Sequence, residues 1–164
     1  MTRAFKAIFA AIILVSSFAA LVTAGPSDDA LDAFVNRDYA TALRLFRLAA
    51  DQGDANGHFM LGVMYATGQG VPQNYAEAVK WYRLATDQGN ADAQYNLGVM
   101  YATGQGVYQD YVSAYMWLSL SASQGEQGAI KGRDLIARRM TPAQIAEAQK
   151  LAREWKPTIT QPPR

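Results

Sequence analysis

The chain has 164 residues, half of them hydrophobic, with 15 Lys and Arg against 14 Asp and Glu, one His and no Cys. This composition excludes a disulfide scaffold, a Cys-ligated metal site and an intrinsically disordered chain. The formal net charge of +1 argues against a protein that binds nucleic acid by neutralising phosphates, so we expect no nucleic-acid partner.

Residues 1–24 have the layout of a secretory signal peptide. Arg3 and Lys6 form a short basic start, an uncharged run of sixteen residues follows, and small residues lead up to Ala24. This pattern predicts cleavage after Ala24 and hence a periplasmic or secreted protein. The alternative is an uncleaved membrane anchor, although the uncharged run is shorter than the roughly 20 apolar residues that span a bilayer.

Residues 25–53 are predicted to form an atypical N-terminal repeat of two helices. The second helix follows Asp38 and ends before Gly53, and Arg37 joins it directly to a first helix at about 27–36. Terminal repeats are commonly atypical, because they must present a polar outer face to water.

The chain then repeats itself with a period of 36 residues. Residues 54–89 align with residues 90–125 without an insertion, and 19 of the 36 positions are identical. Eleven of these identities are consecutive, starting at Leu61 and again at Leu97. Self-similarity of this length at a fixed period indicates repeats that stack on one another to bury a shared core.

Each repeat is predicted to contain two helices joined by a glycine-rich loop. In the first repeat the apolar spacing indicates a helix at about 55–66, which Gly68 ends. Asn74 and Glu77 are expected to form a capping box at the start of a second helix, which extends to about Asp87.

Residues 126–156 are predicted to be C-terminal capping helices, followed by a flexible tail at residues 157–164. The first of these helices is expected to turn Ile130, Leu135 and Ile136 inward. Thr141 begins the second, and Pro157 prevents it from continuing.

The near-neutral total charge hides an acidic body and a basic end. Residues 25–130 carry five basic and eleven acidic side chains, whereas residues 131–164 carry eight basic and three acidic ones. The basic end is interpreted first as the solvated face of the capping helices. The alternatives are a contact with an acidic partner or with anionic lipid head groups, which makes a membrane contact a less favoured hypothesis.

The repeat pattern resembles the Sel1-like repeat family, a relative of the tetratricopeptide repeat. The positions that carry the resemblance recur 36 residues apart and are, in the first repeat, Ala55, Leu61, Gly62, Tyr65, Gly68, Gly70, Val71, Ala78, Trp81 and Gly89. The resemblance implies an all-α fold, a right-handed α-solenoid of helix-turn-helix repeats, and a role as a protein-interaction adaptor. Relatives described as binding β-lactams resemble Cys-rich repeats, from which this chain departs by having no Cys.

First-helix residues that point away from the second helix are expected to line the inner surface of such a solenoid. An apolar surface with amide groups suits a bound peptide or helix. We therefore predict a protein or peptide partner that contacts the following residues: Asn56, Phe59, Met60, Val63, Asp92, Tyr95, Asn96 and Val99.

No constellation of reactive groups predicts catalysis, a metal or a cofactor. His58 is the only histidine, and its counterpart one repeat later is Gln94, so it is interpreted as a polar filler between helices. The sequence thus favours a non-enzymatic scaffold. Two alternatives remain: a small cell-wall or β-lactam hydrolase, and a membrane-surface protein bound through its basic C-terminal helices.

Overall fold

The computed structural model describes residues 26–158, so the predicted signal peptide and the end of the predicted tail lie outside the described residues. Within this range the chain forms helices and no strand. The helices are α2 (Pro26–Val35), α3 (Tyr39–Asp51), α4 (Ala55–Thr67), α5 (Tyr75–Asp87), α6 (Ala91–Thr103), α7 (Tyr111–Ser123), α8 (Gln127–Ala137) and α9 (Pro142–Glu154).

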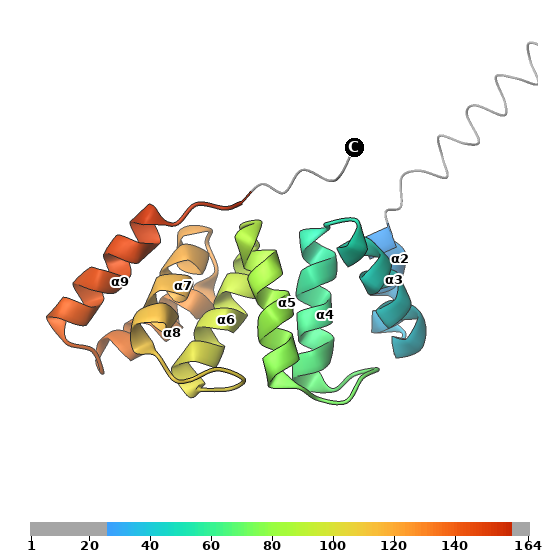
Figure 1. Ribbon diagram of the computed structural model, residues 1–164, viewed down its shortest axis with the longest axis horizontal. Coiled ribbons are helices and arrows are strands. Elements are labelled where there is room, and N and C mark those ends of the chain that lie inside the picture. The colour runs from blue at the N-terminus through green and yellow to red at the C-terminus, as the bar shows by residue number, and fades with distance from the viewer. Residues whose placement is uncertain (1–25, 159–164) are drawn as a thin grey trace, which may run out of the picture.

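The helices up to α8 are stacked side by side in chain order (Figure 1). The two helices of each repeat pack against each other, and the second helix packs against the first helix of the next repeat. The long glycine loops lie along one edge of the stack, the lower edge in Figure 1, and the short turns between successive repeats lie along the opposite edge. The predicted all-α solenoid is therefore confirmed.

Side-chain caps fix where the helices begin. Asp38, Asp54, Asn74, Asn90, Asp110, Glu126 and Thr141 each accept a hydrogen bond from a backbone N–H of the first turn. Such caps satisfy donors that have no partner within the helix. They explain why the predicted and observed helix starts agree closely.

The predicted capping box at Asn74 is only half formed. The Asn74 side chain accepts from the Glu77 N–H at 3.1 Å, but the Glu77 carboxylate bonds to Lys80 instead of returning to Asn74. The Asn74 N–H donates to the Tyr65 carbonyl at 2.8 Å, which closes the glycine loop. A complete box forms between Thr141 and Gln144 at the start of α9.

The core follows the stack as three successive clusters. Phe46 and Leu61 are fully buried in the first, Leu97 in the second, and Leu118 is 1% exposed in the third. Close helix packing inside a repeat depends on Gly62, since a Cβ there would lie 2.5 Å from the Tyr82 ring. Each cluster joins neighbouring repeats, so burial is shared between units.

The last helix departs from the pattern of the repeats. Helix α9 packs against α7, whereas α8 contributes no comparable contact to it. Leu135 on α8 is consequently 60% exposed, so the prediction that it faces inward is wrong, while Ile136 is 5% exposed as expected. Among residues 26–158 no helix combines the length and the apolar character that crossing a bilayer requires.

Candidate partner-binding surface

The eight predicted contact residues all lie on the first helices of the two full repeats, α4 and α6. Asn56 and Asp92 are exposed, Met60 is buried, and the other five are half-buried: Phe59, Val63, Tyr95, Asn96 and Val99. We call the seven accessible residues the first-helix surface.

Tyr82 joins three helices beneath this surface. Its ring, on α5, lies 6.0 Å from the Phe59 ring on α4, and its side chain interacts with that of Asn96 on α6. Burial raises the pKa of Tyr82 well above its ordinary value, so the hydroxyl stays protonated. Phe59 and Asn96 are thus held in place by internal contacts and present only their outer parts to a partner.

Internal packing removes Met60 from the surface. Met60 is 9% exposed and belongs to the first core cluster together with Ala42 and Phe46. The reason is that α4 packs against α3 as well as against α5, and Met60 lies on the side of α4 turned to the preceding repeat. Sequence phase alone had placed it on the accessible face.

Asn56 is tied to the next repeat by a polar contact. The Asn90 side-chain N–H donates to the Asn56 side-chain oxygen at 3.3 Å, and the Asn90 oxygen caps α6 by accepting from the Ala93 N–H at 2.8 Å. This amide contact joins the start of α4 to the start of α6.

His58 is an internal packing residue in this structure. It is 9% exposed, its ring stacks on Trp81 at 5.9 Å, and the Gln88 side chain lies 3.1 Å from its Nδ1. The next repeat has the same arrangement with amides, because Gln124 donates to Gln94 at 2.9 Å. The prediction of a polar interhelical filler is confirmed.

Replacement of His58 by Gln is expected to preserve the fold and to remove one contribution to the pH dependence of its stability. Desolvation lowers the pKa of His58 below its ordinary value of 6.5, against opposing effects of Asp54, the Ala50 backbone and Asp51. The unfolded chain then binds the proton more tightly, so the stability that neutral His58 contributes is complete above pH 6.5 and is lost as the pH falls below it.

Urea unfolding at pH 7.5 and pH 5.5 measures this effect. The wild type should lose more stability between these pH values than His58→Gln, with the two chains similar at pH 7.5. Equal losses in both chains would show that His58 does not contribute to the pH dependence.

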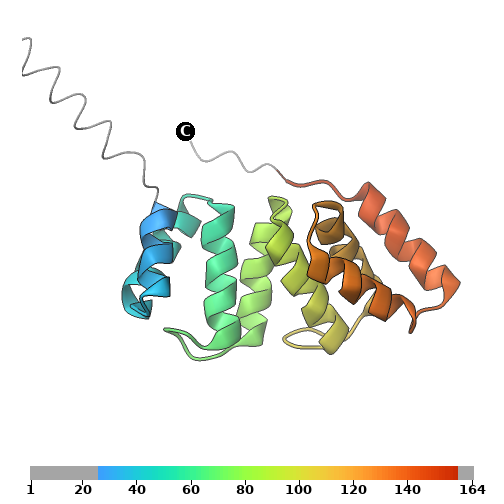
Figure 2. The same cartoon turned by 180° about the vertical axis from the view of Figure 1, so that it is seen from behind.

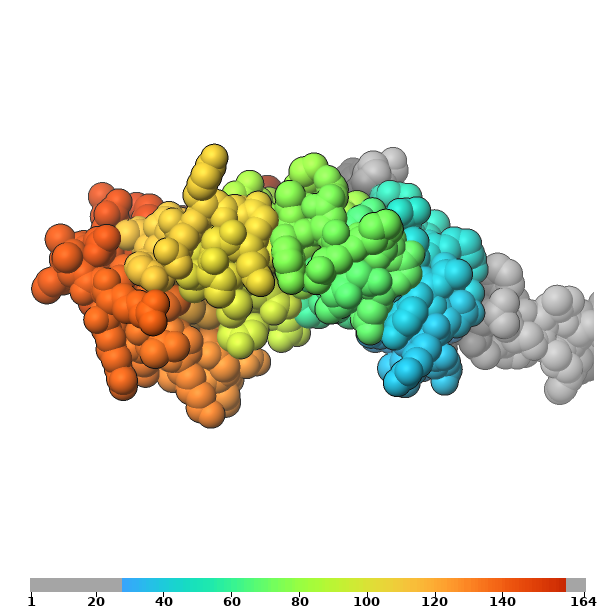
Figure 3. Space-filling model, turned by 90° about the horizontal axis from the view of Figure 1, so that it is seen from below, coloured from blue at the N-terminus to red at the C-terminus, as the bar shows by residue number. Residues whose placement is uncertain are grey.

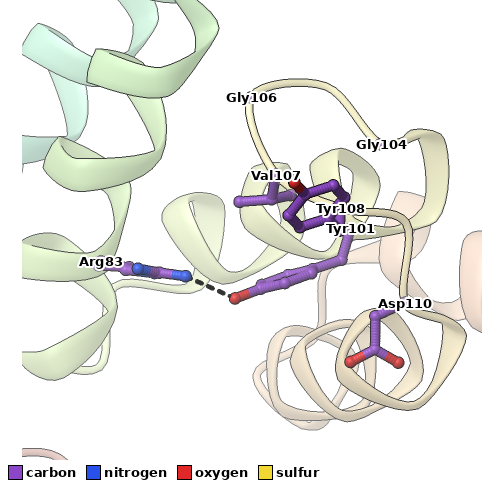
Figure 4. A pocket seen from close by; sticks show the side chains of 7 residues that line it. All are labelled: Arg83, Tyr101, Gly104, Gly106, Val107, Tyr108 and Asp110. Atoms are coloured by element: carbon purple, nitrogen blue, oxygen red, sulfur yellow. Dashed lines mark hydrogen bonds between the residues drawn. The ribbon is translucent and has the colours of Figure 1, made fainter.

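A pocket of about 660 Å³ lies at the loop edge, where the sequence predicted no site. It is lined by Arg83, Tyr101, Gly104, Gly106, Val107, Tyr108 and Asp110 (Figure 4). Arg83, from α5, donates to the Tyr101 hydroxyl at 2.7 Å across the boundary between two repeats. Figure 3 shows this face of the molecule, on which the loops of the two repeats lie next to each other.

The loop-edge pocket combines a cation with aromatic surface. Asp110 is engaged as the cap of α7, bonding to the Val112 N–H and to the Ser113 hydroxyl. Among the described residues Arg83 forms no ion pair. Tyr108 is 97% exposed and stands where the preceding repeat has Pro72, a difference between the two loops that is visible in the sequence.

The described part of the chain offers no constellation for metal chemistry. Within residues 26–158 no three His, Cys, Asp or Glu side chains are grouped closely enough to hold a metal ion. Four of the carboxylates in and beside the repeats, Asp38, Asp54, Asp110 and Glu126, serve as helix caps.

The family model of the Sel1 repeat matches residues 31–54, 55–90 and 91–126. The chain belongs to the Sel1 repeat family. The match includes the atypical first unit, and its boundaries fall one residue later than the repeats predicted from the period. Sel1 repeat proteins are generally scaffolds for protein–protein interactions.

Two solved structures share the fold of this Sel1 repeat protein. One is c5321, a protective antigen of uropathogenic Escherichia coli with an SLR fold, at 28% identity and a TM-score of 0.75 over 79% of this chain and 28% of that one. The other is a Sel1 repeat protein from Oxalobacter formigenes, at 28% identity and a TM-score of 0.64 over 78% of this chain and 54% of that one. The chain therefore spans about a quarter and about half of these two proteins, and no curated protein matched it.

Proposed function

We propose that this Sel1 repeat protein is a non-enzymatic scaffold of the bacterial envelope that binds a protein or peptide on its first-helix surface. The observation that carries the proposal is the recurrence of half-buried apolar and aromatic residues at matching positions of α4 and α6, Phe59 with Tyr95 and Val63 with Val99. The predicted signal peptide supports an exported location.

The chemistry of the first-helix surface suits a peptide backbone flanked by apolar side chains. Val63 and Val99 occupy equivalent positions 36 residues apart, as do the aromatic residues Phe59 and Tyr95. All four are half-buried, so they offer apolar area while being held by the fold. The Asn96 amide adds hydrogen-bonding capacity between them, which is the combination typical of groove-type recognition.

The first-helix surface is best tested by adding charge at Val99. The variant Val99→Arg is expected to retain the fold and lose the bound partner, because a partner that covers this position would have to bury an unpaired guanidinium. Crosslinking in native envelopes, followed by affinity capture, measures the partner retained by each chain.

Leu84→Arg provides the matched control for this experiment. Leu84 lies on the second helix α5 and is 45% exposed, so the same charge is added away from the first-helix surface. The control should keep every partner that the wild type captures. Retention of all partners by Val99→Arg would contradict the proposed surface.

The hydrolase alternative receives no support from the geometry of His58. The imidazole is enclosed by Trp81 and Gln88, and its pKa is lowered by burial without a nucleophile among the groups that contact it. The alternative requires a reactive group in a cleft, and the loop-edge pocket contains none with a neighbouring base.

A further inference from the structure

The segment after α9 turns back across the upper edge of the solenoid toward α5, as Figures 1 and 2 show from opposite sides. We call residues Trp155–Thr158 the C-terminal strap. The Trp155 ring meets the Trp117 ring edge-on, with centroids 5.9 Å apart and planes at 72°. At its far end the Thr158 N–H donates to the Asp87 carbonyl at 2.6 Å.

The strap is an extended segment that contacts both second helices, the middle of α7 at Trp117 and the end of α5 at Asp87. Trp155 has φ −65° and ψ 137°, which is polyproline-like backbone, and Pro157 fixes a similar φ. Pro157 passes over the turn after α5, since its Cβ is 3.8 Å from the position a Cβ would take on Gly89. Asp87 ends α5, so its carbonyl lacks a partner within the helix and is free to accept from an extended chain.

The edge that receives the strap is built by the repeats themselves. Trp117, Gly89 and Asp87 correspond to Trp81, Gly53 and Asp51 one repeat earlier. At Trp81 the ring is already stacked on His58, whereas the counterpart of His58 beside Trp117 is Gln94. The second position therefore has an aromatic ring available for an incoming aromatic side chain.

We propose that Trp117, Gly89 and Asp87 form a binding site for an extended basic peptide of the pattern aromatic-x-Pro, and that the strap is its resident ligand. The strap supplies the aromatic ring and the proline, and Lys156 between them adds a positive charge to a chain whose residues 25–130 carry more acidic than basic side chains. A partner segment with the same pattern displaces the strap. This site is formed by the second helices α5 and α7 and by the turn after α5, whereas the first-helix surface lies on the first helices α4 and α6.

The strap can leave without unfolding the helix that carries it. Helix α9 is anchored on α7 by Ala148, which is fully buried, and by its own capping box at Thr141. One backbone hydrogen bond and one aromatic pair hold the strap, and each is an individually weak interaction. Its advantage over a free peptide is mainly its tethering, which gives a high effective concentration at the site.

A labelled peptide with the sequence of residues 154–164 tests the proposal in the full chain. Fluorescence anisotropy should show that Trp155→Ala, Thr158→Pro binds this peptide at least about tenfold more tightly than the wild type, because the tethered competitor is weakened. The same peptide carrying Trp155→Ala should bind weakly to both chains. Leu84→Ala, which leaves the strap intact, should behave like the wild type.

Two results would overturn the proposal: equal affinity of the double variant and the wild type, or equal affinity of the two peptides. Hydrogen exchange of the wild type gives an independent measurement should the variant be unstable. A large excess of the peptide should speed exchange of the Thr158 amide, and an unchanged rate would count against displacement. Val99→Arg should leave all of these results unchanged, so failure of the first-helix surface and failure of this site are distinguishable.

Discussion

Replacement of Gly106 by Ala is expected to lower the free energy of unfolding by about 3–4 kcal/mol. This loss is larger than the one that a substitution in a loop normally causes. Gly106 has φ 72°, and a Cβ there would lie 2.4 Å from the Tyr75 carbonyl oxygen at the start of α5. A backbone group in a helix start cannot move aside cheaply. The loop of one repeat would thus be pushed away from the preceding repeat.

Gly53→Ala is the matched control, because it separates backbone strain from the steric clash. Gly53 also has a positive φ, 80°, but a Cβ there would meet nothing within 4 Å. Its replacement should cost only about 1 kcal/mol, the usual cost of an L residue in the left-handed region. Urea denaturation followed by circular dichroism gives both values, and similar losses for the two variants would rule out the clash.

The repeat body was predictable because its signals are local. The 36-residue period, the polar caps and the glycine after each first helix all act within a few residues of the helix ends. They predicted α5 with its observed bounds, Tyr75–Asp87, and α2 to within one residue. Arg37, which takes the place of a glycine loop, has φ 63°, so the short first connection turns through a left-handed residue.

The packing of the C-terminal helices was not predictable in the same way, because it depends on which other helix each of them packs against. The apolar spacing of α8 correctly marked Ile136, yet Leu135 is exposed because α9 packs on α7 and leaves that side of α8 uncovered. Likewise Pro157 correctly ends α9, but the bond between Thr158 and Asp87 joins residues far apart in sequence. No local pattern specifies such a contact.

For the candidate surfaces, too, the locally determined features were predictable and those that depend on contacts between repeats were not. Phase along a helix placed the predicted contact residues on α4 and α6, but it could not reveal that Met60 faces the preceding repeat and is buried there. The loop-edge pocket arises only where Arg83 of one repeat reaches Tyr101 of the next. The candidate surfaces of this protein therefore depend on contacts between repeats, which the sequence of a single repeat does not contain.

Contacts limited to neighbouring repeats also mean that stability varies along the stack. The terminal unit formed by α2 and α3 is covered on one side only, and α3 joins it to α4. Phe46 is the largest fully buried side chain and lies in the cluster at this end. Truncation of this side chain should therefore uncouple the unfolding of α2 and α3 from that of the other helices.

Phe46→Ala is accordingly expected to cost about 3–5 kcal/mol and to unfold α2 and α3 before the remaining helices. Besides leaving a cavity, the change removes the edge-on contact with Phe34, whose ring centroid is 6.3 Å away. All three tryptophans lie at or beyond Trp81, so their fluorescence reports on the rest of the stack, whereas circular dichroism also detects the terminal helices. In Phe46→Ala the circular-dichroism signal should begin to fall at lower urea than the fluorescence signal.

Leu48→Ala controls for the loss of apolar volume on the same helix. Leu48 is 45% exposed, so its truncation should cost less than about 1 kcal/mol and leave the two transitions as they are in the wild type. Coincident transitions in Phe46→Ala would mean that unfolding of the terminal unit pulls the whole stack with it. The interfaces between repeats would then be strong relative to the stability of a single repeat. In that case α2 and α3 could not unfold alone, whereas the C-terminal strap at the other end could still leave without unfolding the stack.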